Sequence, residues 1–263
     1  MRRLHLGLAG GLAVVVLGGL ATWRLTRPAK LGLERSRVVL VSGEVTVDGA
    51  RARPKQLLAA ASTVHTGHGA ACFSVHGSRV CTGANSDVVL AELGETSATV
   101  EVKRGTLIVA SVRDDLHVTL PAGSVIVRAA TVAVEDGGAS GTTVRVLDGT
   151  ARVTAGRLAE VFVEAPGAIA LKDGKKRPAA QTLEGEERSI VQLAGSWQGT
   201  AGATLQVDAL HGRVEVDGAD VGLVPAAVLL GEGSHTLVVR DNGREVIRET
   251  LKLNPGETAV RGG

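Results

Sequence analysis

The segment STVHTGHGAACFSVHGSRVCTGANSDVVL, from Ser62 to Leu90, decides how this chain folds. Its centre, His76-Gly77, predicts a two-residue hairpin loop, because glycine adopts a positive φ at little steric cost. Counting outward from that loop places Cys72 directly opposite Cys81. We therefore expect two adjacent antiparallel strands that bring these two residues together.

The two cysteines are the only ones in the 263-residue chain. Facing residues of antiparallel strands lie close enough for a disulfide, which would contribute about 2–3 kcal/mol by loop-closure entropy. Two free thiols in a packed strand pair are the alternative. By alternation, Phe73, Val75 and Val80 share the more apolar face, so we expect the Cys72–Cys81 bond on the more exposed face. A disulfide implies an oxidising compartment.

Composition narrows the class of protein. The net charge is +2, and the chain has 35 Gly, two Phe, two Trp and no Tyr. A near-neutral chain lacks the concentrated basic face that nucleic acids require, so we expect no nucleic-acid partner. The abundance of valine, interrupted by glycine, is typical of many short strands joined by tight turns. The scarcity of aromatic rings disfavours a lectin.

An apolar stretch from Leu4 to Trp23 carries no charge apart from His5. About 20 helical residues span the hydrocarbon core of a bilayer. The stretch therefore predicts a single membrane-spanning anchor, with a cleavable signal peptide as the alternative. The flanking basic residues do not fix the orientation. The expected disulfide places the body of the protein in the periplasm, outside the cytoplasmic membrane.

Apolar residues alternate with a period of two from Val38 onward, which predicts half-buried strands. We expect the following positions to face inward: Val39, Val41, Val45, Val47, Val100, Val102, Leu107, Val109, Leu116, Val118, Leu120, Val125, Val127, Val132, Val134, Val144, Val146, Ala151 and Val153. Asp-Gly pairs at 48–49, 148–149 and 217–218 predict tight turns between strands. The predicted fold class is all-β.

Loss of this alternation between Arg177 and Gly202 marks a Pro-, Gly- and Glu-containing segment that predicts a linker. The sequence therefore divides into four parts. We expect a membrane anchor at 1–30, a β domain at 36–176, a linker at 177–209 and a smaller β domain at 210–263.

Short motifs follow one another in order along the larger β domain, from about Val41 to Gly156. They are Gly43-Glu44-Val45, Val64-His65-Thr66-Gly67, His76-Gly77-Ser78, Asn85-Ser86, Val102-Lys103-Arg104-Gly105 and Val144-Arg145-Val146 with Asp148-Gly149. In order and spacing they resemble a FecR-type domain. The resemblance implies a solenoid- or sandwich-like stack of short strands in the periplasm, which in that family senses an outer-membrane receptor. Typical FecR proteins also carry a cytoplasmic anti-sigma segment before the membrane helix, whereas only a few residues precede Leu4.

The smaller β domain contains a second set of motifs between His211 and Val260. They are Gly212-Arg213-Val214-Glu215-Val216-Asp217-Gly218, Val221-Gly222, Pro225, the segment from Leu230 to Val239, and Pro255-Gly256-Glu257. This arrangement resembles a PEGA domain, which implies a small β-sandwich. We expect Val214, Val216 and Leu237 to supply its core together with Val239.

Few residues suggest chemistry. His65 and His68 form an H-x-x-H pattern whose nitrogens suit zinc, but residues three apart on a strand face opposite sides. The chain has no G-x-S-x-G motif, no P-loop and no dinucleotide fingerprint. We therefore expect no catalytic residues, no metal and no cofactor, and a protein that is not an enzyme.

These patterns predict a membrane-anchored envelope protein with a non-catalytic binding or scaffolding role. It would engage another envelope protein or a surface polymer, for which exposed sheet edges offer a route by strand addition. One alternative is a FecR-type regulator that relays a surface signal across the membrane to a separate anti-sigma or sigma factor. Another is a hydrolase or lectin acting on cell-wall glycans. The oligomeric state stays open.

Overall fold

The computed structural model describes residues 36–111, 115–138, 141–155, 160–172, 176–177, 203–209 and 211–262. The chain forms two compact units, Met1–Glu34 and Arg35–Gly263, and only the second contains described residues. The predicted span from Leu4 to Trp23 lies outside them. Over the described ranges there is no α-helix, and hence none that could cross a membrane. The all-β prediction is confirmed.

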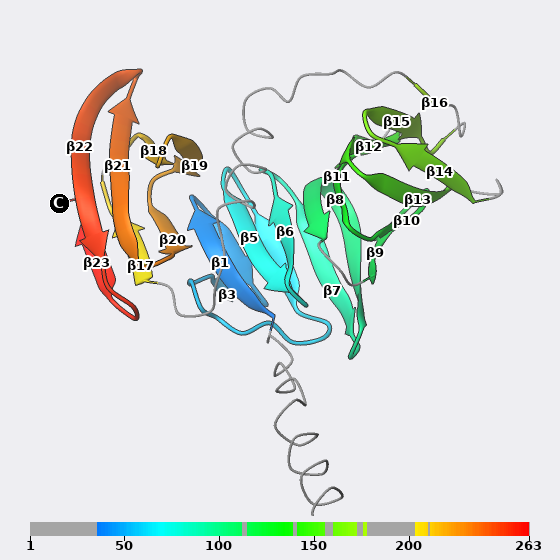
Figure 1. The fold of residues 1–263 in the computed structure, drawn as a ribbon, viewed down its shortest axis with the longest axis horizontal. Coiled ribbons are helices and arrows are strands. Elements are labelled where there is room, and N and C mark those ends of the chain that lie inside the picture. Colours follow the sequence, from blue (N-terminus) through cyan, green and yellow to red (C-terminus); the bar gives the residue numbers. More distant parts are fainter. Residues whose placement is uncertain are drawn as a thin grey trace, which may run out of the picture. The chain divides into compact units, whose positions relative to one another are not determined.

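The largest sheet, sheet A, runs through most of the second unit (Figure 1). Its strands are β1 (Arg37–Ser42), β5 (Ala70–Val75), β6 (Ser78–Thr82), β8 (Ser97–Ser111), β11 (Ala130–Asp136), β12 (Thr142–Asp148), β15 (Gly167–Ala170), β16 (Lys176–Arg177), β17 (Ala203–Val207), β20 (Ala226–Leu230) and β23 (Thr258–Arg261). Their spatial order is β16-β15-β12-β11-β8-β6-β5-β1-β20-β17-β23. All neighbours are antiparallel except β17 and β23.

A second sheet, sheet B, faces sheet A over part of its width. Its further strands are β2 (Val45–Val47), β3 (Ala50–Arg51), β4 (Thr63–Thr66), β7 (Asp87–Leu93), β9 (Asp115–Leu120), β10 (Gly123–Val127), β13 (Thr150–Ala155) and β14 (Val161–Glu164). Their order is β3-β2-β4-β7-β8-β9-β10-β13-β14. The long strand β8 belongs to both sheets: its first half pairs with β7 and its second half with β6 and β11.

The space between sheets A and B holds the first core, core 1. Every alternating position named above from Val41 to Val153 is buried there, as predicted. Val39 is the exception, and that prediction is wrong. The pairing of β1 with β5 shifts between Val38 and Leu40, so a β-bulge places Val38 inward and Val39 on the opposite face.

A third, four-stranded sheet, sheet C, completes the carboxyl-terminal part. Its strands are β18 (Arg213–Val216), β19 (Ala219–Leu223), β21 (Gly233–Asp241) and β22 (Arg244–Leu253), in the order β19-β18-β21-β22. The predicted core residues Val214, Val216, Leu237 and Val239 are buried in a second cluster, core 2. That cluster also contains the β17 and β20 side chains Leu205 and Val228, so sheet C packs on the end of sheet A.

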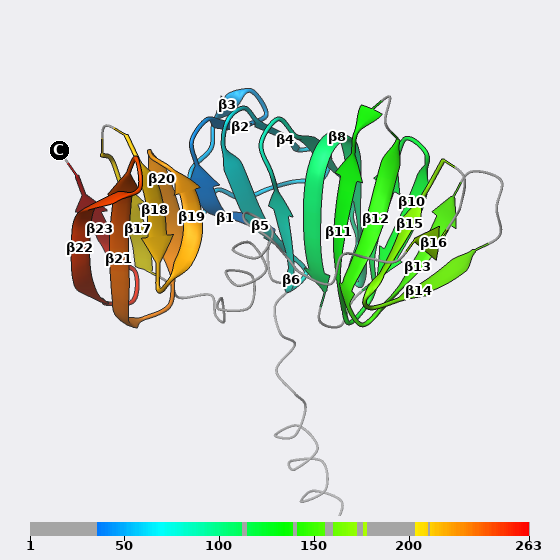
Figure 2. The same cartoon turned by 90° about the horizontal axis from the view of Figure 1, so that it is seen from above.

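The pairing of β1 with β20 makes sheet A continuous across the two sequence-predicted β domains (Figure 2). Leu40 lies beside Val228, and Ser42 beside Ala226. The Ser42 hydroxyl donates a hydrogen bond to the carbonyl of Leu223 at 2.8 Å, and the amide of Gly43 donates one to the carbonyl of Pro225 at 3.0 Å. Residues 178–202 of the predicted linker lie outside the described residues. Its last part, 203–209, contains strand β17, which pairs with β20 and β23 in sheet A.

Candidate functional site

The central hairpin forms with the predicted register. Val75 pairs with Ser78, Phe73 with Val80 and Cys72 with Cys81. Both residues of the His76-Gly77 loop have positive φ, +50° and +76°. Two consecutive positive φ angles give the two-residue turn that matches the twist of a hairpin.

The disulfide between Cys72 and Cys81 is present, with the two Cα atoms 4.0 Å apart. Phe73, Val75 and Val80 lie in core 1, as expected. The prediction that the disulfide occupies an exposed face is wrong, because each cysteine is only 1% exposed. Both faces of this hairpin are buried: the disulfide belongs to core 2.

A single row of side chains across sheet A explains that burial. Following the strand pairings, Leu205, Val228, Leu40, Cys72, Cys81, Ile108 and Ala133 lie side by side on one face. All of them are buried and belong to core 2. The disulfide therefore connects the middle of an apolar row that begins in the carboxyl-terminal part of the chain.

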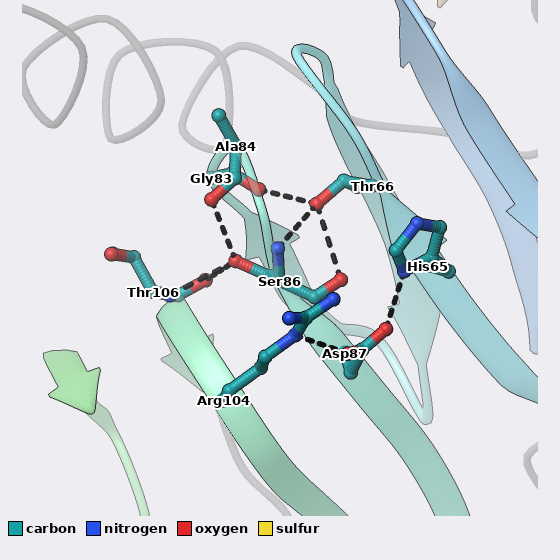
Figure 3. Close-up of polar contacts among 8 residues, drawn as sticks. All are labelled: His65, Thr66, Gly83, Ala84, Ser86, Asp87, Arg104 and Thr106. Carbon is teal, nitrogen blue, oxygen red and sulfur yellow. Dashed lines mark hydrogen bonds and ion pairs between the residues drawn. The ribbon is translucent and has the colours of Figure 1, made fainter. Parts of the chain in front are cut away.

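Three of the motifs that suggested a FecR-like domain meet in one polar cluster (Figure 3). Ser86, just before β7, lies between Thr66 at the end of β4 and Thr106 in β8. The Thr66 hydroxyl donates to the carbonyl of Gly83 at 2.6 Å and accepts from the amide of Ser86 at 2.9 Å. The Ser86 hydroxyl accepts from the amide of Thr106 at 2.9 Å and lies 3.2 Å from that residue's carbonyl. These bonds tie the ends of β4 and β6 and the start of β7 to the middle of β8.

The Thr66 and Ser86 hydroxyl groups of the same cluster are buried and bonded to the backbone. Thr66 and Ser86 are fully buried, and within the described residues their hydroxyl partners are backbone groups. A nucleophilic hydroxyl requires an adjacent general base. Thr66 and Ser86 therefore satisfy backbone groups where β4, β6, β7 and β8 converge, which is a structural role.

The ionisable side chains of this cluster are centred on Asp87. Its carboxylate accepts a hydrogen bond from His65 Nδ1 at 2.5 Å and forms an ion pair with Arg104. Partial burial raises the pKa of Asp87, but the hydrogen bonds from His65 and then Arg104 outweigh it and leave the pKa below its ordinary value of 3.8. The carboxylate is therefore charged at neutral pH and holds β4 and β8 against the first residue of β7.

The H-x-x-H pair separates in space, because β4 ends at Thr66 and His68 lies in the bend that follows. His65 points to Asp87, whereas His68 lines a cavity of 510 Å³ with Glu44, Leu223 and Pro225. Over the described ranges, no group of three His, Cys, Asp or Glu side chains is arranged to hold a metal ion.

A larger cavity opens where sheet B ends and sheet A continues. Sheet B stops at β3, whereas sheet A extends onward through β20, β17 and β23. The resulting step leaves a cavity of 660 Å³, which we call the edge cleft. Its wall is the segment from Arg51 to Lys55, and its floor consists of Thr204, Gln206, Ala227 and Thr258.

The charge of the edge cleft is unbalanced. Arg51, Arg53 and Lys55 line it, whereas Asp208 is the one acidic side chain among its lining residues. Asp208 accepts a hydrogen bond from Gln206 Nε2 at 2.5 Å. In the described part of the chain, the three cationic side chains have neither a hydrogen bond nor an ion pair. The sequence signal for this site, RARPK at 51–55, is short and close to a turn, and the sequence alone did not single it out.

Comparisons with known proteins do not assign the chain to a family. No family model matches the sequence, and no curated protein matches it. Two crystal structures of a candidate anti-sigma factor from Parabacteroides distasonis are similar to the chain, with 15% and 16% identity and a TM-score of 0.41 for each. The similarity covers 49% of this chain and 64%, less than two thirds, of those chains. The FecR-like and PEGA-like assignments stay predictions.

Proposed function

We propose that this chain is a membrane-anchored envelope protein with a non-catalytic binding role, and that it engages another envelope protein. In this proposal the segment from Leu4 to Trp23 is the anchor. The FecR-like part is the body built on sheets A and B, and the PEGA-like part is the sandwich of sheet C on the end of sheet A. The body lies in the periplasm, where the Cys72–Cys81 bond is stable.

The edge cleft is the observation that supports a binding role. It is a concave site of 660 Å³ lined by cationic side chains without partners in the described part of the chain. A cationic surface attracts a partner of opposite charge, because complementary potentials speed association and disfavour partners of like charge. The buried and backbone-bonded hydroxyl groups of Thr66 and Ser86 support a non-catalytic reading of the other polar cluster.

The experiment is site-specific photocrosslinking in intact cells that express the full chain. A photoreactive residue replaces Thr258, which is exposed in the edge cleft, or Thr250, which is exposed on β22 and serves as the matched control. We expect a protein adduct from position 258 and none from position 250. Equal adducts at both positions, or none at either, contradict a binding role for the cleft.

The identity of the adduct separates the proposed function from its alternatives. An envelope protein supports the proposal. An anti-sigma or sigma factor supports the regulator, and glycan adducts support a polymer-binding role. A reporter fused after Gly263 that is active only in the periplasm tests the location, and its inactivity beside an active cytoplasmic reporter overturns the predicted orientation.

A further inference from the structure

The edge cleft gathers three neighbouring cationic side chains that have no ion pair within the described residues. Several other described arginines have a carboxylate partner: Arg104, Arg128, Arg152, Arg213, Arg240, Arg248 and Arg261. Arg51 and Arg53 have none within the described residues, and Lys55 beside them has none either. Three neighbouring cations without partners in the described part of the chain leave a local positive potential, which attracts an anionic ligand.

We propose that the edge cleft binds an acidic segment of a partner protein in an extended conformation, with Arg51, Arg53 and Lys55 pairing with its carboxylates. This inference rests on the proposed function and adds the chemistry of the partner. Arginine suits the task because its planar guanidinium pairs with a carboxylate through two parallel hydrogen bonds.

The floor of the cleft favours a peptide. Thr204, Gln206 and Thr258 offer hydroxyl and amide groups, which can donate to and accept from a peptide backbone. Ala227 beside Gln206 leaves room above the sheet. Strand β17, which forms part of the floor, has five residues and is roughly 16 Å long. An extended peptide of about five residues has the same length.

The residues that line the edge cleft disfavour a glycan as its ligand. Among the described residues, no aromatic ring lines the edge cleft. Phe162, the exposed aromatic side chain among the described residues, lies on β14, at the far edge of sheet B from β3. The described lining of the edge cleft therefore offers no aromatic face on which a sugar ring could stack. An acidic peptide requires no such face, because its carboxylates and backbone supply the contacts.

The test uses the purified full chain and a fluorescent peptide of alternating Glu and Ser, with the Gln-Ser peptide as the uncharged control. Fluorescence anisotropy should show binding of the Glu-Ser peptide alone, and the affinity should fall as salt rises because the contacts are ionic. The variant R51E/R53E should bind roughly 10-fold more weakly or worse, the equivalent of losing about 1.4 kcal/mol.

A matched variant distinguishes a loss of binding caused by changing the edge cleft from one caused by changing the net charge. R244E/K252E makes the same change in charge on β22, where both residues are exposed and outside the edge cleft. It should bind the Glu-Ser peptide as the unmodified chain does. Equal thermal midpoints and an intact Cys72–Cys81 bond in both variants establish that the fold is unchanged.

Three results would overturn the inference: no binding of the Glu-Ser peptide at low salt, equal weakening by both double variants, or tighter binding of polyphosphate or polygalacturonate than of the peptide at matched charge and salt. Failure here is distinguishable from failure of the proposed function. A protein adduct at position 258, combined with no peptide binding, leaves the binding role intact and removes only the acidic class of partner.

Discussion

At the scale of single residues, Gly105 marks the point where β8 passes from sheet B to sheet A. Its φ is +92°, and an added Cβ atom would lie 2.3 Å from Ser86 Oγ and 2.6 Å from Ser86 Cα. The residue therefore combines a backbone conformation that L side chains avoid with a contact that leaves no space for one. It is also the glycine of the Arg104-Gly105 motif that the sequence placed in this domain.

We predict that Gly105→Ala destabilises the protein by about 3 kcal/mol or more, from backbone strain plus disruption of the Ser86 hydrogen bonds. Gly243→Ala is the matched control: its φ is +79° and nothing lies within 4 Å of the added Cβ. Gly243→Ala should lower the free energy of unfolding by only about 1 kcal/mol. Urea unfolding of the full chain measures both, and equal losses would show that the contact with Ser86 is unimportant.

Asp87 should make the stability of the protein depend on pH, because its pKa is lowered in the folded protein. A lowered folded-state pKa stabilises the fold at pH values above the unfolded pKa, and that stabilisation is lost as the pH falls through the folded pKa. We predict that Asp87→Asn lowers the free energy of unfolding by at most about 1 kcal/mol at pH 7, since the cluster is partly exposed. The difference from the unmodified protein should shrink as the pH falls below the ordinary value of 3.8 and through the lowered pKa of Asp87.

The measurement for Asp87 is a series of urea unfolding curves from pH 7 to pH 2. Glu92→Gln is the control, because Glu92 lies on the same strand and, among the described residues, its carboxylate accepts one side-chain hydrogen bond, from Thr99 at 3.4 Å. A difference between the Asp87 variant and the unmodified protein that persists unchanged at low pH would show that packing, and not the charge, is responsible.

At the scale of elements, the central hairpin is buried on both faces. Phe73, Val75 and Val80 face core 1, and the disulfide faces core 2. The disulfide therefore contributes through its loop closure and also through the volume of two buried sulfur atoms.

We predict that C72A/C81A costs about 3–4 kcal/mol, of which about 2–3 kcal/mol comes from the cross-link and the rest from the cavity. C72V/C81V roughly restores the volume and should recover about 1 kcal/mol of this loss. Urea unfolding of both variants and of the unmodified chain provides the comparison. Identical stability of the Ala and Val pairs would mean that the sulfur atoms do not pack in core 2.

At the scale of the whole described unit, the two predicted β domains share one sheet. The β1–β20 pairing places Leu40 beside Val228, and two further hydrogen bonds at Ser42 and Gly43 reinforce it. Residues on both sides of this junction lie in core 2. Cutting the chain between the two parts therefore removes a covalent connection but leaves the apolar contacts and the hydrogen bonds between them.

We predict that the protein stays assembled after it is cut within residues 178–202. A protease recognition sequence inserted after Gly185 allows one specific cleavage, and the uncut insertion variant is the control. The two fragments should co-elute in gel filtration under native conditions and separate only in denaturant, because strand pairing and burial hold them. Two native peaks, each retaining β structure, would show that the β1–β20 junction is too weak to join the parts.

The sequence by itself determined the strands, the turns and one register. Period-two alternation identified the core 1 positions from Val100 to Val153, since a strand must place every second side chain inward. The loop at His76-Gly77 determined the Cys72–Cys81 pairing, because a two-residue turn leaves only one register for its strands. These are local constraints, and local sequence specifies them.

Only the tertiary structure decided the features that depend on residues far apart in the chain. The bulge at Val39, the burial of the disulfide and the edge cleft all follow from β1 pairing with both β5 and β20. Alternation identifies two faces of a strand, but whether the second face meets water or another apolar layer depends on which strands become neighbours. That choice reflects the burial free energy of the whole assembly, with contributions from segments nearly 190 residues apart such as Leu40 and Val228.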